Sequence, residues 1–304
     1  MEENKIPQKE NIADALKKYK EVINSASEEQ RNAVGAAIPK PSTGFNQQEY
    51  EKMMTKETDP DLMTSYEIVK LPSKGLFYSH GISEVNVEYM TSKDEDLLTT
   101  PSLIESGTVL DILLKRKIKT AGIVVEDLLA GDRNAIILFL RSSSYGADYT
   151  VQVSDPRTNI PFTTKVDLLK LRYKEVLELP DENGHFSVEL PMRKKTAVLR
   201  LMSTGEDNKL FKKAEAIKEA YNLEYNEYST LRTKASIVSI GGKTDRSYID
   251  KFVDAMPALD AFTIRRKLLD VSPDVDMAYE FVAKDGYSFK ANLSVGIDFF
   301  FPNT

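Results

Sequence analysis

The sequence predicts an α+β fold in which small mixed β-hairpins combine with helical layers, preceded by a helical arm. Two patterns carry this prediction: short runs with alternating apolar residues between turn-forming residues, and longer runs with apolar residues three or four positions apart. Of the 304 residues, 41% are hydrophobic and 29% are charged, which is typical of a chain that buries a core. We expect a helical arm and flexible linker over residues 1–65, an α+β half over 66–180, and a helical half with a closing hairpin over 181–304.

The N-terminal arm is predicted from a helical stripe and a run of helix-breaking residues. Asn11 can cap a helix whose apolar positions are Ile12, Leu16, Tyr19, Val22 and Ile23. A capping box at 27–30 predicts a second short helix, and prolines and a glycine within 39–44 end it. Because a lone helix of about 14 residues is marginal in water, we expect the stripe to bind another protein chain. A tail that is poorly ordered, or docked on its own chain, is the alternative.

The expected elements of the first half follow from local patterns in chain order. They are strands at 66–71 and 85–89, a helix whose first turn carries the acidic residues 94–96, a helix over 101–118, a short helical turn at 125–129, a helix from Asp132, and strands at 149–153 and 162–168 around a tight turn at 155–159. The second strand pair therefore forms a hairpin with a polar tip.

The second half is predicted to be mainly helical between two hairpins. Its expected elements are a hairpin of strands 186–190 and 197–201, helices at 207–221, 227–240, 247–255 and 258–271, and a closing hairpin of 278–283 and 287–293 around a turn at 284–286. The hairpins at 151–167 and 279–298 resemble each other, which is weak evidence for an internal repeat. The closing run 299–301 consists of three phenylalanines, which either fill the core or form a docking patch; we assign Phe299 and Phe301 to a partner contact.

No catalytic or metal-binding set is visible in the sequence. The chain has no cysteine, which excludes disulfides, thiolate nucleophiles, zinc ribbons and iron–sulfur clusters. Its two histidines, His80 and His185, stand in expected loops without a partner nucleophile or further ligands. The pair Asp94 and Asp96 has D-x-D spacing, but it also suits the start of a helix, where acidic residues are favoured. We therefore predict no catalytic residue, no metal and no cofactor.

The charge and hydropathy of the chain limit the classes of partner that it can bind. The net charge of −6 argues against a protein that coats nucleic acid, and the basic runs at 115–119 and 193–195 lack interleaved aromatic residues. The N-terminus is not a signal peptide, and the most apolar runs are too short to span a bilayer. The sequence therefore predicts partners that are proteins rather than nucleic acid or membrane.

Several short motifs occur in a specific order from residue 71 to residue 302. They are LPSKGLFY at 71–78, MT at 90–91, EDLLT at 95–99, GDR at 131–133, LR at 140–141, SYG at 144–146, ELP at 189–191, VLRL at 198–201, AMPALD at 255–260, PDVD at 273–276 and FFFP at 299–302. In order and spacing they resemble the baseplate hub assembly protein family of T-even-type contractile-tailed bacteriophages. The resemblance covers roughly residues 66–302 and leaves the arm outside it.

The resemblance implies a viral structural or assembly protein that is not an enzyme. Such a protein would join other hub, wedge or tail proteins while the baseplate is built in the host cytoplasm, and would be oligomeric in the assembly. One alternative is a tail-associated hydrolase with an unrecognised Asp/Glu site, which would need a paired acid and base in a cleft. A second alternative is an assembly chaperone that is absent from the mature virion.

The sequence departs from the family at two turns. Many members carry C-P-x-C at the first turn and C-x-x-C-G at the second, a pattern suited to a zinc ribbon. Here these positions read Asp155-Pro156-Arg157-Thr158 and, at 282–286, VAKDG. The resemblance therefore implies degenerate zinc-ribbon-like knuckles without the metal. It also implies that the two turns lie side by side, because one four-ligand site would draw a pair from each.

Overall fold

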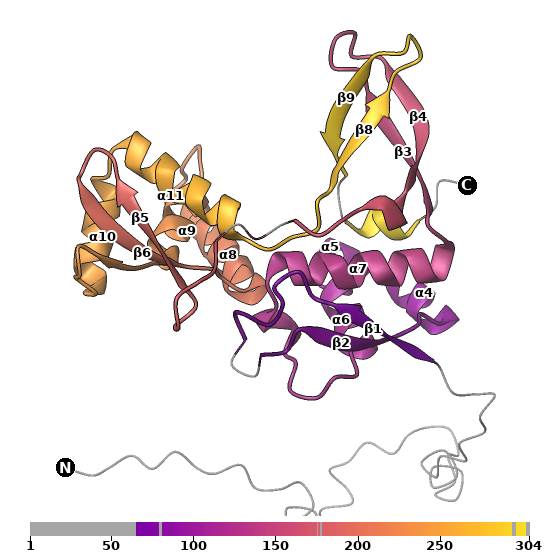
Figure 1. Cartoon of the computed structure of the whole chain (residues 1–304), viewed down its shortest axis with the longest axis horizontal. Helices are drawn as coiled ribbons and strands as arrows, with labels where there is room; N and C mark the ends of the chain where they lie inside the picture. Colours follow the sequence, from indigo (N-terminus) through magenta and orange to yellow (C-terminus); the bar gives the residue numbers. More distant parts are fainter. Residues whose placement is uncertain (1–64, 79–80, 175, 177, 294–295, 302–304) are drawn as a thin grey trace, which may run out of the picture. The chain divides into compact units, whose positions relative to one another are not determined.

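The computed structural model describes residues 65–301 except 79–80, 175, 177 and 294–295 (Figure 1). These residues form a mixed α+β fold with three two-stranded sheets, one three-stranded sheet and eight α-helices in the described part of the chain. All the sheets are antiparallel. The predicted helical arm, including Ile12, Leu16, Tyr19, Val22 and Ile23, lies outside the described residues.

The first part of the fold is a hairpin followed by helices. Its elements are strands β1 (Tyr66–Lys70) and β2 (Glu84–Glu88), helices α4 (Ser92–Leu98), α5 (Pro101–Glu105) and α6 (Val109–Lys117), the 3-10 turn η2 (Val125–Asp127) and helix α7 (Ala130–Tyr145). The single helix predicted over 101–118 is therefore wrong. Gly107 adopts a φ of 67°, a left-handed conformation that glycine tolerates and that interrupts the helix between α5 and α6.

Two hairpins far apart in the sequence lie together (Figure 1). The first consists of β3 (Asp148–Ser154) and β4 (Pro161–Asp167) and is followed by the 3-10 turn η3 (Leu168–Lys170); the second consists of β8 (Ala278–Val282) and β9 (Ser288–Asn292) and precedes the 3-10 turn η4 (Ile297–Phe300). The rings of Phe162 and Phe289 pack edge to face across them, with centroids 6.2 Å apart.

The remaining elements build a second helical layer around a three-stranded sheet. They are strands β5 (His185–Leu190), β6 (Lys195–Arg200) and β7 (Ile237–Ile240), and helices α8 (Thr204–Ala220), α9 (Tyr228–Ser236), α10 (Arg246–Asp254) and α11 (Ala258–Val271). The helix predicted over 227–240 ends at Ser236, and residues 237–240 form a strand instead. Their β-branched side chains suit a strand, and Ile237 and Ile240 are buried in the sheet.

The described residues form two buried hydrophobic clusters. The first draws on β1, β2, α4, α6 and α7, and Phe281 and Leu293 from the closing hairpin also belong to it. The second joins the inner face of the β5–β6–β7 sheet to α10 and α11. The predicted boundary at residue 180 stays a prediction, and the first core reaches across it to the C-terminal hairpin.

Candidate interaction surfaces and the polar nodes behind them

Asp132 fastens the LPSKGLFY turn to the start of α7. The backbone N–H of Ser73 donates to its Oδ1 at 2.9 Å, and the hydroxyl of Tyr78 donates to its Oδ2. The same hydroxyl oxygen accepts from the backbone N–H of Leu129 at 3.0 Å. Burial raises the pKa of Asp132 and, together with the adjacent carboxyl, raises the pKa of Tyr78. Because both oxygens of this fully buried carboxyl are engaged within the fold, Asp132 is a structural node.

The PDVD motif packs against the same end of α7. A Cβ atom at Gly131 would lie 2.1 Å from the carbonyl oxygen of Pro273, so that only glycine allows this approach. Asn134, one turn along the helix, donates from its Nδ2 to Asp274 at 3.1 Å. The GDR and PDVD motifs, which are 140 residues apart in the sequence, thus form one contact.

Arg141 joins α7 to the C-terminal phenylalanines. Its side chain is 1% exposed, and its Nε donates to the carbonyl oxygen of Phe299 at 2.7 Å. The second guanidinium contact runs to the carbonyl oxygen of Gly146 at 3.1 Å. Burial lowers the pKa of Arg141. The LR, SYG and FFFP motifs therefore meet at one buried cation.

The phenylalanine run divides between core and surface. Phe299 and Phe300 are each 1% exposed, whereas Phe301 is 37% exposed. The run forms a 3-10 turn rather than an alternating strand, so two consecutive rings reach the core. The assignment of Phe299 to a partner contact is thereby corrected, because its ring is not on the surface. Phe301 is partly exposed, so its assignment to a partner contact stays a prediction.

Asp260, at the start of α11, caps the turn between β5 and β6. Its two carboxylate oxygens accept from the backbone N–H groups of Met192 at 2.8 Å and Arg193 at 3.1 Å. Asp260 is fully buried. Asp132, Arg141 and Asp260 all belong to the sequence motifs, but their spacing does not predict that they are nodes. Only Asp260, which stands between Leu259 and Ala261, shows a sequence signal, a charge inside an apolar run.

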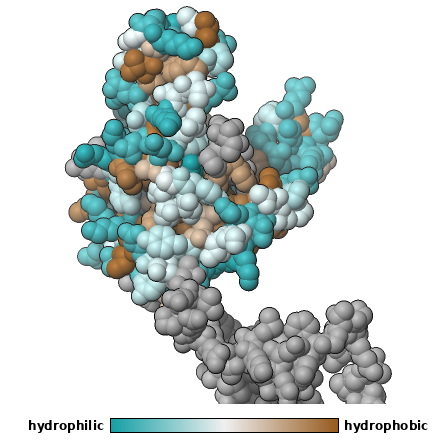
Figure 2. All heavy atoms as spheres, turned by 90° about the vertical axis from the view of Figure 1, so that its right-hand side faces the viewer, coloured by the Kyte–Doolittle hydropathy of each residue, from teal (hydrophilic) through white to brown (hydrophobic). Residues whose placement is uncertain are grey.

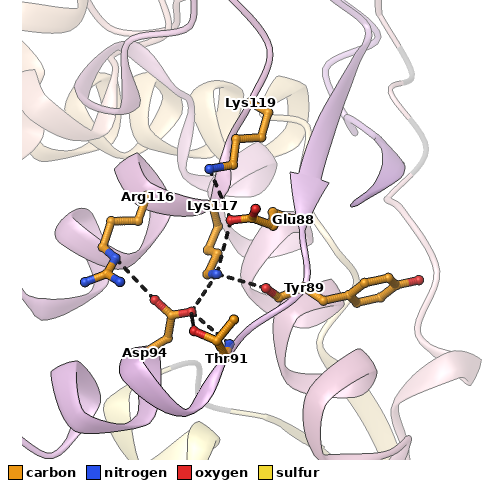
Figure 3. A network of polar contacts seen from close by, with 7 residues as sticks. All are labelled: Glu88, Tyr89, Thr91, Asp94, Arg116, Lys117 and Lys119. Carbon is orange, nitrogen blue, oxygen red and sulfur yellow. Dashed lines mark hydrogen bonds and ion pairs between the residues drawn. The ribbon is translucent and has the colours of Figure 1, made fainter. Parts of the chain in front are cut away.

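A buried ion-pair network holds β2, α4 and α6 together (Figure 3). Lys117 is 3% exposed, and its Nζ lies 2.6 Å from Oδ2 of the fully buried Asp94. The same Nζ contacts Glu88 at 3.3 Å and donates to the carbonyl oxygen of Tyr89 at 2.8 Å. Burial alone would raise the pKa of Asp94, but hydrogen bonds from Lys117 and Thr91 outweigh it and hold that pKa below its usual value.

The two knuckle turns at 155–158 and 282–286 lie side by side, as the resemblance implied, and an arginine joins them. The Nη2 atom of Arg157 lies 2.7 Å from Oδ2 of Asp155 in its own turn. The same atom lies 2.7 Å from Oδ2 of Asp285 in the second turn. The guanidinium also lies 3.7 Å from the ring centroid of Tyr287. The prediction that the turns lie side by side is confirmed. The chain has no cysteine to form a zinc ribbon here. The ionic and cation–π contacts of Arg157 join the two turns instead.

The described residues contain no group of three or more His, Cys, Asp or Glu side chains placed to hold a metal ion. His185 lies 4.0 Å from Asp181 at the edge of a hairpin, and His80 falls outside the described residues. Within the described ranges, burial raises the pKa of the Asp132 carboxyl, which is enclosed by Ser73 and Tyr78. No paired acid and base in a cleft supports the hydrolase alternative there.

Helix α11 presents an apolar face to the outside. Leu259, Phe262 and Leu269 are 51%, 52% and 69% exposed, and their spacing places them along one side of the helix. Arg265 is exposed beside them, and Arg266 is exposed between Phe262 and Leu269 on the same side of the helix. On the face of the molecule seen in Figure 2, hydrophobic residues lie singly or in small groups between hydrophilic ones. The three large apolar side chains on one side of α11 make this face a candidate interaction surface.

In a search against protein-family models, residues 63–300 match a family described as T4 bacteriophage base plate protein. The matched region contains every buried node described above. Neither the curated proteins nor the solved structures include a match to this chain. Within the described ranges, no helix has the length and apolar character required to cross a membrane.

Proposed function

Since the chain belongs to the T4 bacteriophage base plate protein family, we propose that it is a component of the baseplate hub. The family is one of structural proteins of the phage tail, and the chain is accordingly a base plate protein of the virion tail. Its action there is to join neighbouring hub, wedge or tail proteins through protein–protein contacts. It assembles with them in the host cytoplasm and is oligomeric in the assembly.

The exposed apolar face of α11 is the observation that carries this proposal. Fully burying a leucine or phenylalanine side chain stabilises by about 1.5–3 kcal/mol, so covering three half-exposed ones favours association by a few kcal/mol. Arginine is common at protein interfaces: Arg265 is exposed beside the row, and Arg266 lies within it, where it pairs with Asp270 at 3.6 Å. The face therefore suits an apolar surface rimmed by carboxylates on another base plate protein. Asp260 holds the helix behind it to the β5–β6 turn.

Two further contacts belong to the same proposal. The apolar stripe Ile12, Leu16, Tyr19, Val22 and Ile23 is assigned to a helix that binds a second partner chain, since its side chains gain most from burial in a groove. Phe301, which is 37% exposed at the C-terminal end of the described residues, is assigned to a partner contact as well.

Complementation tests the proposal. Cells infected with a phage that lacks this chain are supplied with the wild-type chain or with Leu259→Asp combined with Phe262→Asp. We expect the variant to keep the wild-type melting temperature, because both side chains are half exposed, and to yield few complete base plates by electron microscopy. The matched control replaces Tyr221 and Tyr225, which are exposed on another segment, by Asp. A folded α11 variant that restores base plates to the wild-type number would contradict the proposal.

A further inference from the structure

Strand β1 has one edge without a partner strand in the described part of the chain. Its register with β2 pairs Val69 with Val85 and Glu67 with Val87. Hydrogen bonds from Leu71 to Ser83 and from Tyr89 to Ser65 show that the odd positions of β1 turn their backbone groups toward β2.

The even positions of β1 therefore turn their backbone N–H and C=O groups outward. The hydroxyl of Tyr173 donates to the outward carbonyl oxygen of Lys70 at 2.6 Å, so this group at one end of the edge already has a partner. At Ile68 no described residue hydrogen-bonds to either outward group. The side chain of Ile68 is 55% exposed. Such an edge is a template for another extended chain.

A groove of about 700 Å³ runs beside this edge. Its floor is α7, through Leu138 and Phe139, and its far rim is η3 with the residues that follow it. Ile68 forms the near rim, and Leu169 stands on the far rim with 75% of its surface exposed. A segment that pairs with β1 would thus lay alternate side chains on an apolar bed.

The charged residues that line the groove are both cations. They are Lys70 and Arg172, and no carboxylate belongs to the lining. A second copy of this chain would bring two Lys70 and two Arg172 side chains into one interface with no lining carboxylate to offset them. The groove therefore suits a segment that carries acidic side chains.

We propose that the groove receives an extended apolar segment with carboxylate side chains from a neighbouring base plate chain, which adds a strand to β1. The backbone of that segment would satisfy the outward N–H and C=O of Ile68, and its acidic side chains would pair with Lys70 and Arg172. Naming a base plate chain as the source rests on the function proposed above. The groove and its preference for an acidic strand rest on the structure of β1, α7 and η3.

The test uses the full-length chain and a fluorescent heptapeptide that alternates Glu with Val or Ile. We expect saturable binding by fluorescence anisotropy. Ile68→Pro removes the outward N–H but no hydrogen bond to β2, so it should weaken binding at least about tenfold, whereas Ile68→Val should not. Lys70→Glu with Arg172→Glu should abolish binding of the acidic peptide and create binding of its lysine counterpart.

A second probe does not depend on the protein variants. The same peptide with an N-methyl group on every amide has no N–H left to donate to β1, and it should bind at least about tenfold more weakly. No binding of the unmodified peptide, or equal binding of the methylated one, would overturn the proposal. A dimer in sedimentation that Ile68→Pro dissociates would also overturn it, because the occupant would be a second copy. None of these outcomes affects the complementation result for α11. The groove proposal can therefore be refuted without refuting the proposed function, and the reverse also holds.

Discussion

Lys117→Met removes the cation that compensates the buried Asp94, and it should be among the most destabilising single changes in the first core. The side chain of methionine keeps most of the volume of the lysine stem, so the change removes charge rather than packing. In the wild type the Lys117 Nζ lies 2.6 Å from Asp94, and the two side chains are 3% and 0% exposed.

The magnitude follows from what remains around Asp94. Removing one partner of a buried ion pair costs about 3–5 kcal/mol, because the other charge stays buried without compensation. Here Arg116 still lies 3.2 Å from Oδ1, and the backbone N–H of Thr91 still donates to Oδ2 at 2.9 Å. We therefore expect a loss of unfolding free energy of about 2–3 kcal/mol at neutral pH.

Acidification should shrink this loss. In the wild type the pKa of Asp94 is lowered, so its contribution is present above the ordinary pKa of the unfolded chain and is lost as pH falls through the folded value. Without Lys117, burial dominates and raises the pKa of Asp94. Protonation as pH falls toward about 4 then removes the uncompensated buried charge from the variant. The difference in unfolding free energy between wild type and variant should narrow.

Urea unfolding followed by circular dichroism measures both quantities. Lys119→Met is the matched control, since Lys119 is 46% exposed and pairs with Glu88 at 3.1 Å; it should cost less than about 1 kcal/mol. The double variant Asp94→Asn with Lys117→Met should recover part of the loss. Equal losses for Lys117→Met and Lys119→Met, or a Lys117→Met loss that grows on acidification, would refute the reasoning.

Three further predictions follow from the nodes and the arm. Asp132→Ala leaves the buried donors of Ser73 and Tyr78 without an acceptor and should cost about 2–4 kcal/mol in the same urea experiment; a loss below about 1 kcal/mol would contradict the node. Arg157→Lys cannot reach both carboxylates and the Tyr287 ring, so amide exchange at 284–286 should accelerate, and unchanged exchange would show that the knuckles hold without it. Leu16→Asp with Ile23→Asp should leave the melting temperature of the globular part nearly unchanged while weakening assembly; a drop of several degrees would mean that the helix packs on its own chain.

Local patterns predicted most elements because the hairpins and helices have clear periodicity and turn residues. The strand pairs β1–β2, β3–β4, β5–β6 and β8–β9 all match predicted runs. The two wrongly predicted helices have physical causes that a short stretch of sequence does not reveal. Strand β7 has residues that fit either a helix or a strand, and its pairing with β6 decides between them. Gly107 divides α5 from α6 because a turn there needs a left-handed residue.

The sites were less predictable than the elements. Family resemblance implied that the turns at Asp155 and Asp285 meet, but the bridging role of Arg157 required the geometry. Phe299 is buried although the sequence predicts a surface position, because a 3-10 turn rather than an alternating strand carries two rings into the core. The exposed row on α11 has ordinary amphipathic spacing in the sequence. Only the packing of Ile264 and Asp260 shows which side of that helix faces inward.

Quantitative mass spectrometry of purified virions tests the central proposal most directly. A permanent hub component should yield peptides from this chain at a fixed ratio to other base plate proteins, and the ratio should persist in base plates isolated from the virions. Complete absence of the chain from purified particles, with abundant chain in the infected cells, would contradict a structural role in the virion and favour an assembly chaperone.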